Sequence, residues 1–225
     1  MTASRTPLRL AVLVSGRGSN LAAIAARCAD GTLAATIVQV LSDREDAGAL
    51  PWCASQGIAA RAIAAATFRQ DGQFDRDGFE SALMQAIDAS GAQLVVLAGF
   101  MRVLSARFVA HYAGRLLNIH PSLLPRHKGL HTHERALAAG DLEHGASVHY
   151  VTAELDGGPV VLQARVPVLP NDTADTLAAR VLSQEHQLYS QVIGWIATDR
   201  LQWRNGRPRF DGIALNAPLQ KGELT

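Results

Sequence analysis

A chain of 225 residues, of which 48% are hydrophobic and 18% are charged, is long enough to bury one substantial core. We expect a single domain over residues 1–200, followed by a polar tail over residues 201–225 that forms no separate domain. The formal net charge of +1 makes no electrostatic case for binding nucleic acid or a membrane surface, since either normally requires a basic patch. A small-molecule partner is therefore the expectation.

Cysteine content and the N-terminal sequence indicate the compartment. Cys28 and Cys53 are too few for a disulfide framework and neither lies in a CxxC pair, which favours a reducing environment. Residues 1–9 lack the apolar stretch of a signal peptide, and no segment approaches the roughly 20 apolar residues of a membrane span. We expect a cytoplasmic protein.

The first half of the chain alternates between apolar runs of strand length and segments with apolar residues at helical spacing. The first run is typical of a parallel strand buried on both faces. Alternation of this kind predicts a Rossmann-like, mostly parallel sheet with helices on both faces. Strands are predicted at Leu8–Val14, Thr36–Leu41, Leu94–Ala98 and Leu116–His120, and helices at Asn20–Cys28, Ala47–Gln56, Phe79–Ala89 and Ser105–Tyr112, the last capped by Ser105.

The pattern changes after Gly129. Val148–Val151 and Val160–Val168 are apolar runs on either side of Asp156-Gly157-Gly158, which suggests an antiparallel pair. A long helix is predicted over Thr173–Thr198. The predicted fold class is therefore α/β, with an antiparallel C-terminal part of the sheet.

The segment Ser15–Asn20, with the sequence SGRGSN, lies where the first predicted strand meets the first predicted helix. Backbone N–H groups and the positive end of the helix dipole would face an anion there, and a phosphate fits best. Leu21 occupies the place of the third glycine of a dinucleotide fingerprint, and the Gly-Lys-Ser/Thr ending of a Walker loop is missing. A plain tight turn, with Ser19 capping the helix, is the alternative.

Three polar residues form a candidate catalytic set. Asn118 and His120 stand two apart at the end of an apolar run, so on a strand their side chains would share one face and one pocket. Asp156 precedes two glycines further along the chain, where a turn residue is the ordinary interpretation. An amide, an imidazole and a carboxylate can stabilise an oxyanion, move a proton and orient the group that moves it. The set predicts acyl-type transfer without a covalent intermediate.

A metal site is the competing interpretation of the histidines that follow. His127, His131 and His133 include one HxH pair, but no further ligand of suitable spacing accompanies them. We therefore expect pocket or surface histidines and no metal. The two cysteines are expected to be small buried apolar groups.

Six sequence blocks, in this order along the chain, resemble those of the phosphoribosylglycinamide formyltransferase family, the folate-dependent enzymes of purine synthesis. The NIHPSLLP and DGG elements are shared by the wider formyltransferase family, which includes methionyl-tRNA formyltransferase, whereas the GSNL loop and the short length select the glycinamide enzymes. The blocks are SGRGSNL at Ser15–Leu21, LAGFMRVLS at Leu97–Ser105, LLNIHPSLLP at Leu116–Pro125, GLHTH at Gly129–His133, ELDGGPV at Glu154–Val160 and QEH at Gln184–His186.

The resemblance implies a role for each matching residue. Asn118, His120 and Asp156 would be catalytic. The ribonucleotide would be held by Gly18, Ser19 and Asn20 at its phosphate and by Glu185. Leu182 departs from the family, because a polar substrate contact is expected three residues before Glu185, so one hydrogen bond is missing or supplied elsewhere. The folate would be bound by Arg76, Met101, Arg102, Val103, Leu104, Asn118, Thr152, Ala153, Glu154, Leu155 and Asp156.

The resemblance also implies a reaction. The amine of glycinamide ribonucleotide would attack the formyl carbon of 10-formyltetrahydrofolate, the co-substrate, with no metal and no covalent enzyme intermediate. Asn118 and His120 would hydrogen-bond the oxyanion, and Asp156 would orient His120 as an acid toward the departing nitrogen.

Related activities are the alternatives. A formyltransferase acting on methionyl-tRNA would need a basic C-terminal domain, for which the residues after Thr198 are too few. A folate hydrolase would share the catalytic set but generally has an additional N-terminal domain, whereas the first predicted strand begins at Leu8. A binding protein without chemistry would be expected to lack part of the catalytic set, which is intact. The sequence leaves both a monomer and a homodimer open.

Overall fold

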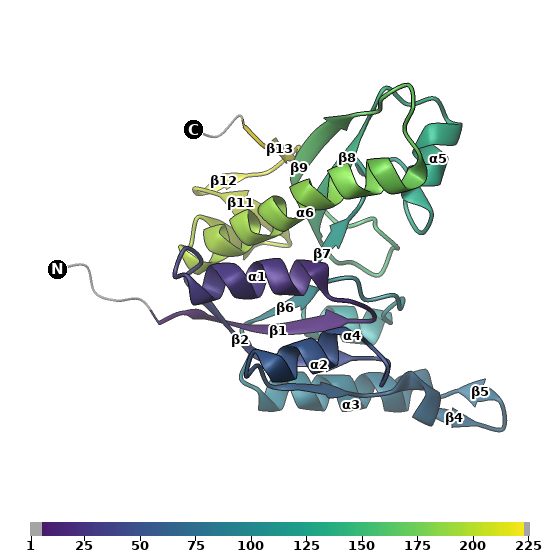
Figure 1. The fold of residues 1–225 in the computed structure, drawn as a ribbon. Coiled ribbons are helices and arrows are strands. Elements are labelled where there is room, and N and C mark those ends of the chain that lie inside the picture. Colours follow the sequence, from purple (N-terminus) through teal and green to yellow (C-terminus); the bar gives the residue numbers. More distant parts are fainter. Residues whose placement is uncertain (1–5, 223–225) are drawn as a thin grey trace. The chain divides into compact units, whose positions relative to one another are not determined.

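The computed structural model describes residues 6–222. The chain divides after Leu116 into two compact units, an N-terminal unit and a C-terminal unit. Figure 1 labels their helices and strands.

The N-terminal unit is built on four parallel strands in the order β6-β1-β2-β3. In the central strand β1, residues 10–14 are completely buried, which is what an apolar run in the middle of a parallel sheet requires. The parallel, helix-alternating half of the predicted fold is confirmed. The strands are β1 (Leu8–Val14), β2 (Ala35–Ser42), β3 (Ala60–Ala62) and β6 (Leu94–Leu97).

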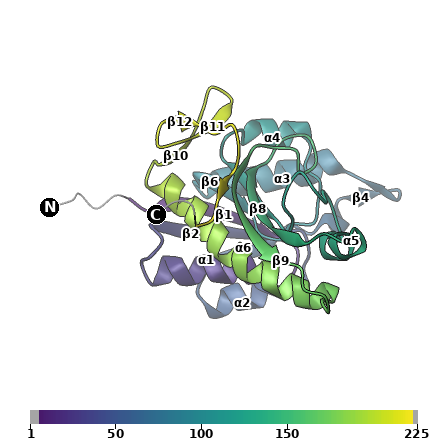
Figure 2. The ribbon, with the colours of Figure 1, turned by 90° about the horizontal axis from the view of Figure 1, so that it is seen from above.

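Helices cover both faces of these strands. In Figure 2, α1 and α2 lie on one side of the sheet and α3 and α4 on the other. The Ser105 side chain accepts a hydrogen bond from the Phe108 N–H and caps α4, as predicted. The elements are α1 (Ser19–Ala29), α2 (Ala49–Ser55), α3 (Arg76–Ala89) and α4 (Ala106–His111), with a short 3-10 helix η1 (Ala65–Thr67) and a hairpin of β4 (Arg69–Gln70) and β5 (Gln73–Phe74).

The C-terminal unit contains strands in the order β13-β9-β8-β7. Antiparallel pairs join β7 to β8 and β8 to β9, and only β13 runs parallel to its neighbour β9. The predicted antiparallel C-terminal part of the sheet is thus confirmed. The strands are β7 (Leu116–His120), β8 (Glu143–Tyr150), β9 (Val160–Pro167) and β13 (Leu219–Gln220).

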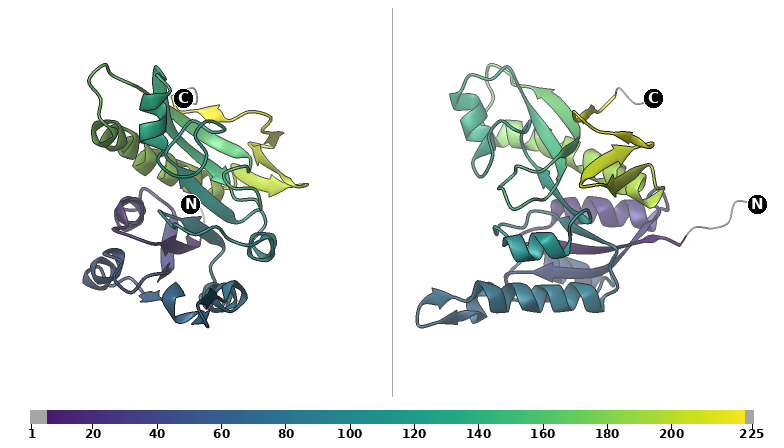
Figure 3. Two further views of the ribbon diagram at one scale, coloured as in Figure 1. Left: turned by 90° about the vertical axis from the view of Figure 1, so that its right-hand side faces the viewer. Right: turned by 180° about the vertical axis from the view of Figure 1, so that it is seen from behind.

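The long helix α6 (Ala174–Ala197) packs along β8 and β9, where Figure 3 shows it lying against one face of the strands. Thr173 caps its N-terminus through a capping box. The buried Tyr189 donates its hydroxyl hydrogen to the Leu117 carbonyl at 2.9 Å, so the helix holds the start of β7. The predicted helix is confirmed, whereas α5 (Thr132–Ala138) was not predicted from the sequence.

Residues 201–220 are more ordered than the polar pattern suggests. They form an antiparallel three-stranded sheet of β10 (Leu201–Arg204), β11 (Arg207–Phe210) and β12 (Ile213–Ala214), followed by β13. Two aromatic contacts attach this sheet, Trp203 to Tyr150 and Phe210 to Trp195, with ring centroids 4.7 and 4.6 Å apart. The single domain over residues 1–200 stays a prediction. Over residues 6–222, every helix is too short or too polar to span a membrane.

Candidate active site

Strand β7 carries two of the predicted catalytic side chains. Asn118 and His120 are two residues apart on one strand and therefore face the same side. Antiparallel pairing with β8 places His149 opposite Asn118 and Ser147 opposite His120. His120 is 6% exposed, so water has little access to its ring.

Asp156 lies in the turn between β8 and β9, and this turn depends on its glycines. Asp156 has a φ of 47°, in the left-handed region that few residues other than glycine, asparagine and aspartate adopt. At Gly158 a Cβ atom would lie 1.8 Å from the Tyr150 carbonyl oxygen, so no side chain fits there. Gly158 is thus required by the close approach of this turn to the backbone at the end of β8.

His120 and Asp156 meet. Their Nδ1 and Oδ2 atoms are 3.4 Å apart, and both side chains are largely buried, at 7% and 8% exposure. The Gly129 N–H donates to the same Asp156 oxygen at 2.8 Å, which fixes the carboxylate. The structure therefore brings together the three residues predicted as a catalytic set.

The other ring nitrogen of His120 also has a partner. His120 Nε2 lies 3.0 Å from the His127 carbonyl oxygen. A carbonyl can only accept, so Nε2 must be the donor and bear a hydrogen. Residues 127–129 thus touch both His120 and Asp156, through one carbonyl and one N–H.

His149 fixes the orientation of the Asn118 amide. His149 Nδ1 lies 3.0 Å from the Tyr150 carbonyl and must donate to it, which leaves Nε2 of the neutral ring as an acceptor. Asn118 Nδ2, 3.1 Å away, supplies the donor. Burial lowers the pKa of His149 from 6.5 to about 4 and outweighs the opposing charge of Asp156, whose Oδ1 is 3.7 Å from Nε2.

His149 was not predicted as a site residue from the sequence. It lies in a predicted strand, but its partner depends on the register between β7 and β8, which no local pattern gives. The β8–β9 register also shifts between Val148 and His149, a bulge of the kind that redirects side chains beside active sites. A histidine inside an apolar run was the only available signal.

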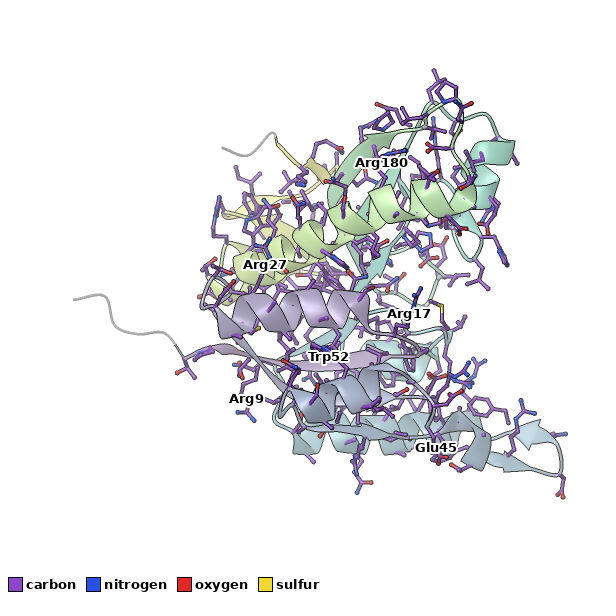
Figure 4. The ribbon with its side chains drawn as sticks, in the orientation of Figure 1. Arg9, Arg17, Arg27, Glu45, Trp52 and Arg180 are labelled. Atoms are coloured by element: carbon purple, nitrogen blue, oxygen red, sulfur yellow. The ribbon has the colours of Figure 1, made fainter. Side chains whose placement is uncertain are left out.

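The predicted phosphate loop lies at the start of α1 in the N-terminal unit. Gly18 is the N-cap, with a φ of 78°, and a Cβ there would lie 2.9 Å from the Ala49 Cβ. The alternative in which Ser19 caps the helix is wrong, because Ser19 is the first helical residue and no side-chain cap bond forms within the described residues. The positive end of this 11-residue helix faces the loop, which favours an anion there. Exposed Arg17, labelled in Figure 4, adds a cation beside this loop, while Asn20 is buried.

The predicted folate segment 101–104 is also in the N-terminal unit. Met101 and Val103 are 69% and 56% exposed, whereas Leu104 is buried. The Met101 N–H donates to Ser15 Oγ at 2.8 Å, and Arg102 donates to the buried Asp43 at 2.5 Å. The guanidinium of Arg102 is therefore occupied by its ion pair with Asp43. A cavity of about 360 Å³ adjoins the segment and is lined by Ser15, Gly16, Asp43, Arg44, Gly99, Met101 and Arg102.

The remaining predicted contacts are spread over both units. Arg76 is the first residue of α3 and is exposed. On α6, Glu185 is 8% exposed and Leu182 is half-buried. Residues 152–156 form the turn after β8, where Lys128 pairs with Glu154 at 2.6 Å and Leu155 is 51% exposed. The roles of these residues stay predictions.

The three histidines considered as metal ligands do not converge. His127 Nε2 contacts Asp141 at 2.7 Å, His133 contacts His144 at 3.1 Å, and the exposed His131 lies 3.5 Å from Glu134. Over residues 6–222, His, Cys, Asp and Glu side chains form no group of three or more placed to hold a metal ion.

Known proteins resemble this chain in both sequence and structure. The family model described as formyl transferase matches residues 8–193. Phosphoribosylglycinamide formyltransferase from Escherichia coli (strain K12) is 49% identical over 208 residues, which are 92% of this chain and 96% of that protein. The solved phosphoribosylglycinamide formyltransferase from Coxiella burnetii is 46% identical, with a TM-score of 0.88 over 95% of this chain and 99% of that one. The chain therefore belongs to the formyl transferase family and, within it, to the phosphoribosylglycinamide formyltransferases, as its sequence blocks predicted.

A more distant structure resembles this chain in fold alone. The formyltetrahydrofolate deformylase from Pseudomonas syringae is 23% identical, with a TM-score of 0.82. The alignment covers 92% of this chain and 67% of the deformylase chain.

Proposed function

We propose that this protein transfers the formyl group of 10-formyltetrahydrofolate to the amine of glycinamide ribonucleotide in purine synthesis, in the cytoplasm. The observation that carries the chemistry is the buried contact of 3.4 Å between His120 and Asp156, with Asn118 on the same strand face as His120. Membership in the phosphoribosylglycinamide formyltransferases supports the choice of both substrates.

In the first step the neutral amine nitrogen forms a bond to the formyl carbon, and the formyl oxygen becomes an oxyanion. One N–H of Asn118 is taken by His149, which leaves the second N–H of the same amide free to donate to that oxygen. Nε2–H of His120 becomes a second donor when it leaves the His127 carbonyl, its present partner. Each such donor typically lowers the barrier by about 3 to 4 kcal/mol.

In the second step the bond from the formyl carbon to the folate nitrogen breaks, and that nitrogen takes a proton. His120 donates it from Nε2 once that nitrogen leaves the His127 carbonyl, while Asp156 continues to orient the ring through Nδ1. A ring with a hydrogen on each nitrogen satisfies both acceptors. The attacking amine loses one proton, through Asp156 or a water, which restores His120. The formyl group and one proton have then exchanged places between the two nitrogens.

The substrates would be held by the residues that the family resemblance implies. The positive end of the α1 dipole suits the ribonucleotide phosphate, and Arg17 adds a positive charge beside it. Exposed Met101 and Val103 suit an apolar wall for the folate ring. Glu185 would contact the ribonucleotide and Arg76 the folate.

The test is to follow tetrahydrofolate release by absorbance with and without glycinamide ribonucleotide, with mass spectrometry of the nucleotide. We expect release only when the amine is present, with one formylated nucleotide for each tetrahydrofolate. Equal release without the amine, together with formate, would identify a folate hydrolase instead. If no tetrahydrofolate is released either with or without the amine, both activities are refuted.

A matched pair of variants assigns the activity to this site. His120→Ala removes the buried ring beside Asp156, whereas His111→Ala removes a histidine on α4 whose side chain is 38% exposed. Activity should be lost in the first variant and kept in the second, with both folded by circular dichroism.

A further inference from the structure

Gln163, on β9, lies in a buried hydrogen-bond chain that begins at the C-terminal strand. Its Nε2 atom donates both hydrogens at 2.9 Å, one to the Leu124 carbonyl and one to Ser147 Oγ. Its Oε1 atom accepts from Gln220 Nε2 on β13 at 3.3 Å. The residue is 4% exposed, so each lost partner would leave a polar group without water.

The far end of this chain holds the backbone that follows His120. Ser147, which is completely buried, accepts from the Leu124 N–H at 3.1 Å and donates to the Ser122 carbonyl at 2.7 Å. With the bond from Gln163, both the N–H and the carbonyl of Leu124 are fixed. This backbone leads directly into residues 127–129, which contact His120 and Asp156. A shift at Leu124 would therefore be passed to the catalytic pair.

The other end of this hydrogen-bond chain, at Gln220, is held in place by the residues of the C-terminal tail. Strand β13 pairs with β9 so that Gln220 lies beside Gln163, and the Lys221 N–H donates to the Gln163 carbonyl at 2.8 Å. Lys221 Nζ reaches Gln184 and Gln187 on α6 at 2.6 and 2.5 Å. The tail thus joins the outer strand of this sheet to the helix that covers it.

The directions of these bonds leave one consistent arrangement. Arg165 can only donate, and its Nε lies 3.4 Å from Gln220 Oε1, so the Gln220 amide nitrogen points to Gln163. The Leu124 carbonyl can only accept, so the Gln163 nitrogen must point toward it. The side-chain hydrogen bonds therefore run in one sense from Gln220 through Gln163 to Ser147, an arrangement in which successive bonds strengthen one another.

We propose that Gln163 is a positioning residue for formyl transfer and that strand β13 holds it in place. Gln163 touches the backbone that carries the catalytic loop and acts through that backbone. The inference rests on the proposed function, because it assigns to Gln163 and the tail a part in the geometry of His120 and Asp156. Residues 219–221 would then help to set the geometry of the catalytic pair, in addition to covering the edge of β9.

The decisive variant is Gln163→Met. It keeps the length and approximate volume of the side chain and removes the three hydrogen bonds of the side-chain amide. Its control is Gln56→Met, the same change at an exposed position whose side chain contacts Ser55 and lies outside this hydrogen-bond network. We expect Gln163→Met to lower kcat by about ten- to a hundredfold, since small misplacements at a catalytic group have such effects. Both KM values should stay within about twofold, because substrate contacts are kept. The control should match the native enzyme.

A purely structural role would predict a different result. If Gln163→Met only lowers stability, kcat for each folded molecule stays native once the folded fraction is measured by circular dichroism, and the proposal is overturned. If this variant does not fold, Gln220→Met decides, because it removes one partner of Gln163 and leaves the other two. A native kcat in Gln220→Met then overturns the proposal, and a reduced kcat with unchanged KM values supports it.

Amide hydrogen exchange at Leu124 separates this proposal from the proposed function. Loss of the Gln163 bonds should speed exchange of the Leu124 N–H by about tenfold, whatever reaction the protein catalyses. Fast exchange with no amine-dependent transfer in the native protein would refute the function and keep the structural hold. Native exchange and native kcat in an active enzyme would refute the positioning role alone.

Discussion

Acidification is expected to destabilise this protein through a buried histidine. Burial lowers the pKa of His149 from 6.5 to about 4, and the residue is 2% exposed. Between these two values the unfolded chain binds a proton that the native state does not. The free energy of unfolding should therefore fall as the pH falls through this window, and the penalty should be absent at higher pH.

The expected magnitude is large. A pKa lowered by roughly 2.5 pH units corresponds to about 3 kcal/mol of stability lost when the pH reaches the native pKa. His144 adds a similar amount, because burial first, and then the neighbouring His133 and His127, lower its pKa to about 4. Together the two histidines would remove about 6 kcal/mol, comparable with the whole stability of many domains.

Urea unfolding between about pH 4 and pH 7, followed by tryptophan fluorescence, measures this dependence. His149→Gln and His144→Gln should each reduce the slope, and the double variant should reduce it further, while His133 and His186, whose pKa values burial also lowers, keep part of it. A flat profile in the native protein, or an unchanged slope in the double variant, would refute the assignment of neutral buried rings.

The same protonation should affect turnover. A proton on Nε2 of His149 stops that atom from accepting the Asn118 hydrogen bond, so the amide must rotate and present its oxygen to the ring. The N–H proposed to face the oxyanion then leaves its position. We expect kcat to fall as the pH approaches about 4, the pKa of His149 in the native state, and a kcat that does not change down to the unfolding transition would contradict this role of His149.

Three further predictions concern the proposed reaction. His120→Ala should abolish formyl transfer and leave binding of both substrates largely intact by equilibrium dialysis; normal turnover would remove His120 from the mechanism. Asn118→Ala should lower kcat by about two to three powers of ten in steady-state assays, and a smaller loss would mean that its free N–H does not meet the oxyanion. Replacing Ser19 and Asn20 by glutamate should raise the KM for the ribonucleotide much more than that for the folate, and the reverse pattern would exchange the two pockets.

Much of the fold could be predicted because the apolar runs are long and their periods are clear. Leu8–Val14 and Leu116–His120 are strands with the predicted bounds, and the helix predicted at Thr173–Thr198 runs over Ala174–Ala197 with both flanking residues as caps. The short strands of residues 201–220 were missed. Each has two to four residues and draws its stability from aromatic contacts and strand pairing that a local pattern does not contain.

The site was predicted in part for the same reason. Two residues on one strand share a face by geometry, so Asn118 and His120 could be placed together from their spacing alone. Their partners could not. His149 and Gln163 reach the site through cross-strand register, and the His127 carbonyl through a loop whose path follows no periodic pattern. Backbone groups carry no sequence signal, although here they determine which nitrogen of each histidine is a donor.

The two histidines nearest Asn118 illustrate how neighbours assign chemical roles. In each ring one nitrogen faces a backbone carbonyl and must therefore donate: Nδ1 of His149 to Tyr150, and Nε2 of His120 to His127. The second nitrogen distinguishes them. For His149 it meets the Asn118 amide, a donor, so the neutral ring is satisfied and burial keeps it neutral. For His120 it meets the Asp156 carboxylate, an acceptor, so only a hydrogen on that nitrogen makes a hydrogen bond there. Exchanging these partners, for example by Asp156→Asn, would let His120 be satisfied as a neutral ring, and the proposed acid would then lack the proton it has to give.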